Sequence, residues 1–268
     1  MRMARRRAVR PRASRRRLDA PYLASGAGSH ALRRGGSAVD AAIAANAVLC
    51  VVYPHMAGLG GDGFWLIGEA TGRVHGINAS GPTTRLATRD YYRPRSKNGE
   101  IPPRGPLSAL TVPGAIDGWR IAHERFGRLD WREFFEDSIV YARDGAPASR
   151  SLVQWTAKAT DVLMERPATA AIFLPGGRVP LVGQRLVEAD LARSLVEIAA
   201  KGSRAAFYEG GVAERICADL QAEGSPLRAD DFGEFHAEWV EPIASLWPAR
   251  QARRGARQAH VNARAFVS

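Results

Sequence analysis

The chain has 268 residues, 46% of them hydrophobic, which is enough for a substantial core in one large or two small domains and excludes a wholly disordered protein. The formal charge of +11 suggests a protein that binds nucleic acid. However, nine arginines lie in residues 1–17 and five in residues 248–268, and neither segment contains an acidic residue. The rest of the chain has 24 basic and 27 acidic residues, so the positive charge comes from the two ends and not from an excess of basic residues in its body.

The two arginine-rich tails, residues 1–21 and 246–268, are predicted to be disordered or divergent additions to one domain at 22–245. They show no amphipathic period and no recognition helix, so we do not expect nucleic acid as a partner. A non-catalytic module that binds phosphates through these tails stays open as an alternative.

No export or membrane segment is expected from this sequence. Leu18 is followed at once by Asp19, Ala20 and Pro21, so the N-terminal arginines do not precede the apolar stretch of a secretory signal. No run approaches the roughly 20 apolar residues of a membrane span. By default we expect a cytoplasmic protein with no membrane partner.

Residues 24–63 predict a sharply capped helix that runs into a glycine-rich loop. Ser37 and Asp40 form a capping-box pattern after Gly35-Gly36, which places a helix at Ala38 to about Leu49. Its faces are mostly alanine with few polar groups, which favours burial against a neighbouring backbone.

A hairpin and a long surface loop are predicted next. Phe64–Ile67 and Arg73–Asn78 are strand-like and flank a turn at residues 69–72. The density of proline, glycine and arginine from Ser80 to Pro106 predicts a long loop, a common place for ligand contacts.

The second half of the chain predicts mostly helices. Their boundaries follow from capping residues and from glycines that end each helical period. The predicted elements are a helix opened by 112–114 and ending at about Phe126, one capped by Asp130 and Glu133 and ending at about Arg143, helices at Ser151–Met164, Asp190–Ala200 and Val212–Glu223, a turn at 173–177, a short helix from Leu227, and a strand within His236–Ile243.

The glycine loop does not predict a dinucleotide site. Gly58, Gly60 and Gly63 match G-x-G-x-x-G, but that fingerprint needs a following helix and an acidic residue about 20 positions later. Here a strand-like run follows, and Val74–Ser80 contains no acidic residue. We therefore expect no nucleotide cofactor.

Metal, disulfide and nucleophile patterns are also weak. The six histidines are scattered, so no metal site is predicted. Cys50 and Cys217 lie far apart in apolar helical patterns and are predicted to be buried thiols. Thr83 and Thr84 have no neighbouring base in sequence and are interpreted as turn residues.

These motifs, taken in order, resemble the large-subunit half of the γ-glutamyltransferases, also called γ-glutamyltranspeptidases or glutathione hydrolases. The similarity covers about residues 22–245. It is carried by Ala24-Ser25-x-Ala27-Gly28, Gly35-Gly36-x-Ala38-Val39-Asp40-Ala41-Ala42, Gly58-x-Gly60-Gly61-x-Gly63-Phe64, Thr111-Val112-Pro113-Gly114, Phe173-Leu174-Pro175, Phe207-Tyr208, and Asp230-Asp231-Phe232 through Glu241-Pro242-Ile243.

The resemblance implies an α+β fold, the helix-rich part of an N-terminal-nucleophile hydrolase αββα sandwich. It also implies a precursor that cleaves itself to expose a threonine. That threonine attacks a γ-glutamyl amide such as glutathione, and water or an amino acid then receives the γ-glutamyl group. No cofactor is implied.

This chain departs from the family pattern at the site. The family's threonine and oxyanion hole belong to the small subunit, so no catalytic residue is assigned here, and we expect a fragment that needs a separate small-subunit chain. The family's arginine for the substrate α-carboxylate is replaced by residues 78–82, Asn-Ala-Ser-Gly-Pro. Ser80 and Arg85 are the candidate substrate-binding residues. A related amidase, such as a cephalosporin acylase, stays open as an alternative function.

Overall fold

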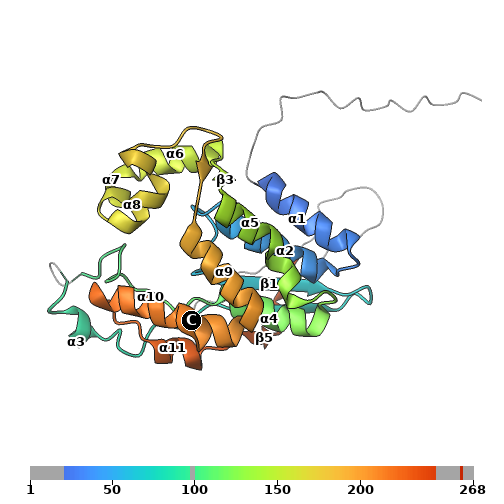
Figure 1. The fold of residues 1–268 in the computed structure, drawn as a ribbon. Helices are drawn as coiled ribbons and strands as arrows, with labels where there is room; N and C mark the ends of the chain where they lie inside the picture. Colours follow the sequence, from blue (N-terminus) through green and yellow to red (C-terminus); the bar gives the residue numbers. More distant parts are fainter. Residues whose placement is uncertain (1–20, 97–99, 246–259, 262–268) are drawn as a thin grey trace, which may run out of the picture.

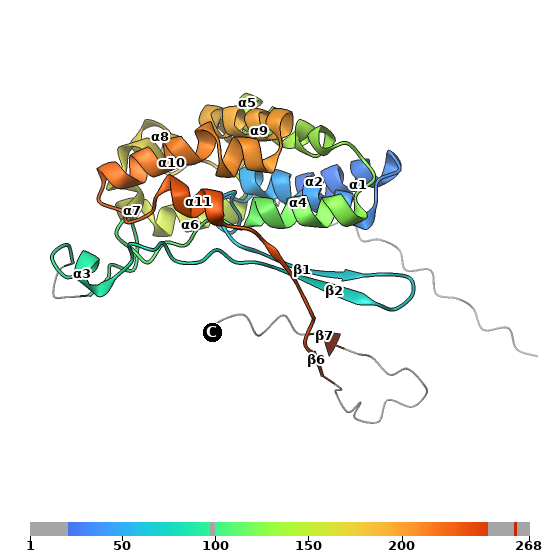
Figure 2. The ribbon, with the colours of Figure 1, turned by 90° about the horizontal axis from the view of Figure 1, so that it is seen from below.

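Helices cover one face of a small antiparallel sheet in this computed structural model, which describes residues 21–96, 100–245 and 260–261 (Figures 1 and 2). The arginine-rich tails lie outside the described residues, apart from Pro21 and residues 260–261. The helices are α1 Pro21–Arg33, α2 Ala38–Val52, α3 Arg89–Tyr92, α4 Ala115–Phe126, the 3₁₀ turn η2 Trp131–Phe135, α5 Glu136–Asp144, α6 Arg150–Lys158, α7 Thr160–Met164, α8 Pro167–Phe173, the 3₁₀ turn η3 Pro175–Gly177, α9 Ala189–Lys201, the π-helix η4 Arg204–Tyr208, α10 Gly211–Ala222 and α11 Ala229–Glu234. The strands are β1 Gly63–Gly68, β2 Val74–Ala79, β3 Ala146–Pro147, β4 Arg185–Leu186, β5 Glu238–Val240, β6 Ala244–Ser245 and β7 His260–Val261.

The main sheet has the order β1-β2-β5, with both pairs antiparallel. Trp65, Ile77 and Trp239 lie in register on the face that the helices cover, and Ile77 is fully buried. Leu66 lies on the other face and is 43% exposed. The sheet is therefore covered by helices on one side only, as Figure 2 shows.

Helices α1 and α2 form the centre of the core because small residues let them approach closely. A Cβ on Gly28 of α1 would lie 3.0 Å from the carbonyl oxygen of Ala41 in α2. Ile43, Ala47 and Val48 of α2 have no measurable exposure. The alanine-rich pattern thus predicted the burial of α2 correctly.

Both predicted capping boxes are present. The Ser37 hydroxyl accepts from the Asp40 N–H, and the Asp40 carboxylate accepts from the Ser37 N–H. Asp130 and Glu133 form the second box, which opens η2 before α5 continues to Asp144. The predicted hairpin, α4, α9 and α10 are also confirmed.

One helical prediction was wrong, and helices α1, α3 and α8 were not predicted. Helix α1 was not predicted, since its two glycines and two serines weaken the helical signal and packing on α2 decides it. The single helix at Ser151–Met164 is wrong: the chain breaks at Ala159 into α6 and α7, where the Thr160 hydroxyl bonds back to the Thr156 carbonyl. Helix α8 was also missed.

The remaining predictions agree with the structure in outline. Cys50 and Cys217 are buried free thiols, 3% and 2% exposed. Strand β5 occupies only the centre of the predicted strand at 236–243. The whole is helix-rich with few strands, which agrees with the predicted α+β class.

Candidate functional site

The glycine loop, residues 58–63, is fixed against the start of α4. The Gly61 carbonyl accepts hydrogen bonds from the N–H groups of Gly114 (3.0 Å) and Ala115 (2.9 Å). This carbonyl therefore satisfies amides at the helix N-terminus, where a dinucleotide fold would place a phosphate. Strand β1 follows the loop, as predicted, and no helix begins there.

The turn after β2 is held against the glycine loop by Asp62. The Asp62 carboxylate accepts from the Gly81 N–H at 3.1 Å. The Asn78 side-chain carbonyl accepts from the Ser80 N–H (3.1 Å) and from the Ser80 hydroxyl (2.7 Å). Ser80, one predicted substrate contact, is thus half-buried and already uses its proton within the turn.

A hollow of about 450 Å³ lies at the junction of the glycine loop, β1, α2 and α4. Asn46 and Asp62 give it polar groups, while Trp65 and Trp119 give it aromatic walls. Its other lining residues are Ala42, Met56, Ala57, Gly58, Gly61, Gly63, Phe64 and Ala115. A hollow lined by both polar and apolar groups suits a small ligand or the packing of another segment.

Arg85, the second predicted contact, is held by a different part of the chain. Its guanidinium is 77% exposed and forms an ion pair with Glu234 at the end of α11. Its backbone N–H donates to Asp231, and the buried Thr84 hydroxyl donates to the Pro226 carbonyl at 3.1 Å. The structure ties Ser80 to the glycine loop and Arg85 to α11, so the two are not joined in one contact network.

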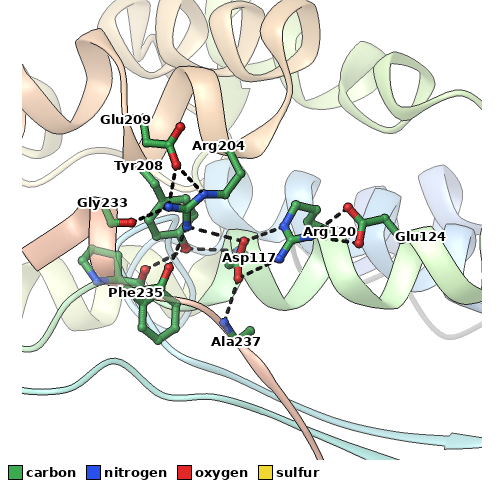
Figure 3. A network of polar contacts seen from close by, with 10 residues as sticks. Asp117, Arg120, Glu124, Arg204, Tyr208, Glu209, Gly233, Phe235 and Ala237 are labelled. Carbon is green, nitrogen blue, oxygen red and sulfur yellow. Dashed lines mark hydrogen bonds and ion pairs between the residues drawn. The ribbon is translucent and has the colours of Figure 1, made fainter.

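A buried polar network, which the sequence did not reveal, fixes the chain as it enters β5 (Figure 3). The Asp117 carboxylate has no exposure and binds the Arg120 guanidinium, with 2.7 Å from Nε to Oδ1. It also accepts from the Ala237 N–H at 2.7 Å, one residue before β5. Since Asp117 lies in α4 and β5 lies far along the chain, only the tertiary structure brings them together.

The π-helix η4 completes this network. Arg204 donates to the carbonyls of Gly233 and Phe235, each at 2.6 Å, and lies 3.9 Å from Asp117. The Tyr208 hydroxyl donates to the Pro113 carbonyl (2.8 Å) and accepts from the Asp117 N–H (3.1 Å). Burial raises the pKa of Tyr208, and hydrogen bonding to Asp117 raises the pKa of Arg120. Tyr208 and Arg120 therefore keep their protons, which suits a structural role.

One histidine–hydroxyl pair lies outside these contacts. His55 Nε2 is 2.9 Å from the Ser151 hydroxyl, while His55 Nδ1 is buried without a hydrogen-bond partner. Burial lowers the pKa of His55. Without a third group to orient the ring, the pair lacks one part of a nucleophile–base arrangement.

Within residues 21–96, 100–245 and 260–261, no three His, Cys, Asp or Glu side chains gather as metal ligands. In the same residues no helix has both the length and the apolar character needed to cross a bilayer.

Comparison with known proteins gives consistent matches. The Gamma-glutamyltranspeptidase family model matches residues 24–253. A glutathione hydrolase-like YwrD proenzyme of Bacillus subtilis is 45% identical over 225 residues, which are 84% of this chain and 42% of that protein. The chain thus spans about two fifths of the length of the curated relatives it matches.

Two solved structures have the same fold. The γ-glutamyltranspeptidase of Pseudomonas nitroreducens complexed with L-DON has a TM-score of 0.77 at 27% identity, covering 89% of this chain and 68% of that one. A cephalosporin acylase of Bacillus halodurans has a TM-score of 0.77 at 33% identity, covering 83% of this chain and 42% of that one.

Proposed function

The chain belongs to the γ-glutamyltranspeptidase family, and on that premise we propose that it supplies the large-subunit part of an enzyme that cleaves γ-glutamyl amides. The γ-glutamyl group would pass to water or to an amino acid. The proposal is carried by one observation, the match of residues 24–253 to the family model. The resemblance and the N-terminal-nucleophile hydrolase fold predicted from the sequence are confirmed.

We propose that the attacking hydroxyl lies outside these 268 residues. The Thr84 hydroxyl is buried and donates to the Pro226 carbonyl, so it has no base beside it. Ser151 has a histidine partner, but the ring of His55 lacks an orienting hydrogen bond. A nucleophile needs an adjacent base in a fixed orientation, which supports assigning none here.

A chromogenic assay tests both proposals. The chain alone is expected to give no turnover of γ-glutamyl-p-nitroanilide. Co-expression with the part of the Bacillus subtilis relative that this chain does not match is expected to restore turnover, with that part alone as the control. Turnover by the chain alone, or a covalent acyl adduct on any of its serines or threonines, would contradict our assignment of the nucleophile.

We propose Ser80 and Arg85 as substrate contacts in the assembled enzyme. Arg85 would exchange Glu234 for the substrate carboxylate, a bidentate task for which guanidinium is suited. Arg85→Gln should then raise KM for the γ-glutamyl anilide about tenfold or more and leave butyryl anilide unchanged. Arg89→Gln, an exposed arginine in α3, is the control.

A second candidate is an amidase that acts on an acyl group without an α-carboxylate. It is favoured by the neutral Asn78–Ser80 turn and by the ion pair that engages Arg85. The likeness to a cephalosporin acylase also supports it. Faster turnover of butyryl than of γ-glutamyl anilide by the assembled enzyme would favour this candidate over the first.

A cytoplasmic location and the absence of nucleic-acid binding stay predictions. Deleting residues 1–17 and 248–268 tests the second one. If the full chain bound DNA in a salt-sensitive way and the deleted chain did not, the tails would have a function of their own.

A further inference from the structure

A second cavity, of about 320 Å³, lies between the turn that follows α2 and the group of helices α6, α7 and α8. It shares no lining residue with the hollow at the glycine loop. Its lining residues are Pro54, His55, Arg104, Leu152, Trp155, Thr156, Ala159, Leu163 and Phe173. Its volume is within the usual range of small-molecule sites, about 300–1,000 Å³.

The cavity has three polar groups with unused hydrogen-bonding capacity. Among the described residues, the Arg104 guanidinium has no acidic partner and the Thr156 hydroxyl has no hydrogen bond, although Thr156 is only 4% exposed. The third group is the ring of His55, which contacts Ser151 through Nε2. A buried polar atom without a partner costs free energy, so His55 Nδ1, which is buried and has no hydrogen-bond partner, indicates that something else completes this site.

The positive charge of the cavity favours a negatively charged ligand. Arg104 is a cation and no lining residue is acidic. Burial lowers the pKa of His55, so the ring adds a polar edge without a second positive charge near neutral pH. A single carboxylate would balance Arg104, and an amine would find no partner.

The apolar walls of the cavity favour a ligand with an apolar body. Leu152, Leu163 and Phe173 provide apolar surface, and the indole of Trp155 is half exposed beside them. An aromatic or branched aliphatic group would cover this surface, and covering it is favourable because apolar area leaves water.

From these features we propose that this cavity binds a small carboxylate with an apolar, preferably aromatic, body. The carboxylate contacts Arg104, and the body packs on Trp155 and Phe173. The site is independent of the acyl-transfer function proposed above, since it needs no residue beyond this chain.

Titration calorimetry with 4-phenylbutyrate, on the soluble, folded fraction of the full chain, tests the proposal. We expect saturable binding, at least tenfold weaker binding of the neutral 4-phenylbutanamide, and a loss of tenfold or more in 4-phenylbutyrate affinity on Arg104→Gln. The amide should bind the Arg104→Gln variant as it binds the original chain. Arg89→Gln, which removes an exposed arginine outside the cavity, should change neither affinity.

A second variant separates binding in the cavity from binding at the surface. Ala159→Phe places a ring inside the cavity and should abolish binding of both compounds, while thermal melts check that the chain stays folded. Unchanged binding in a folded Ala159→Phe variant would overturn the proposal. So would equal affinities of the original chain and Arg104→Gln for 4-phenylbutyrate, or no saturable binding at millimolar concentration.

Discussion

Glu188 shows how one side chain can make stability depend on pH. It is 9% exposed at the start of α9, and burial raises its pKa from 4.5 to about 7. The folded chain therefore holds a proton that the unfolded chain releases between these values, so stability falls as pH rises through this window. Burial raises the pKa of the Cys50 thiol to about 12, and the nearby Glu188 carboxylate contributes a smaller part of that rise.

Glu188→Gln should remove this dependence. At pH 8 the variant should be more stable than the original chain by about 1–3 kcal/mol, and near pH 5 the two should be alike. Urea unfolding at pH 5, 6.5 and 8 measures this. Glu214→Gln, an exposed change on α10, should leave the pH dependence as it is. A Glu188→Gln variant that loses stability equally at every pH would contradict the argument.

Position 81 requires glycine because the backbone of Val112 lies too close to leave room for a side chain. A Cβ there would lie 1.6 Å from the Val112 carbonyl oxygen, so alanine would push the Ser80 turn away from Val112. Gly81→Ala should cost about 1–3 kcal/mol in the free energy of unfolding. The control is Gly26→Ala in α1, where nothing lies within 4 Å and alanine should stabilise the helix by about 0.5–1 kcal/mol. Equal effects in urea titrations would refute the contact argument.

At the scale of elements, local sequence signals predicted where some helices begin, and tertiary contacts decided where others form or break. The capping boxes at Ser37 and Asp130 placed two helical starts because the interactions lie within four residues. The break at Ala159 and the existence of α1 were not predictable in the same way, since packing and back-bonding outweigh helix propensity there.

Asp117 joins three elements, so its neutralisation should affect more than α4. Asp117→Asn leaves Arg120 and Arg204 without their buried anion and should cost about 3 kcal/mol or more. A weaker hydrogen bond from Ala237, now to a neutral amide oxygen, should also loosen β5, which a change in tryptophan fluorescence at Trp239 would report. Asp144→Asn, which breaks an exposed pair with Arg143, should have little effect on either measurement.

At the scale of the whole molecule, the main sheet has one face that none of the described helices covers. Helices cover one face, and Leu66 on the other face is 43% exposed. A chain that supplies only part of an αββα sandwich leaves apolar faces open to solvent, and such faces promote association.

We therefore expect the isolated chain to be poorly soluble. Co-expression with the unmatched part of the Bacillus subtilis relative should raise the soluble yield and the melting temperature, as gel filtration and thermal scans would show. A monodisperse chain with a cooperative melt that co-expression does not change would contradict this expectation.

The sequence by itself determined the family, the hairpin, most helix boundaries and the two buried thiols, because glycine spacing, caps and apolar periods act over a few residues. Only the tertiary structure decided that Asp117 holds β5, that Arg85 pairs with Glu234, and that Arg104 and Thr156 line one cavity. These contacts join residues dozens of positions apart, and their free energy depends on burial and orientation, which no local pattern in the sequence records.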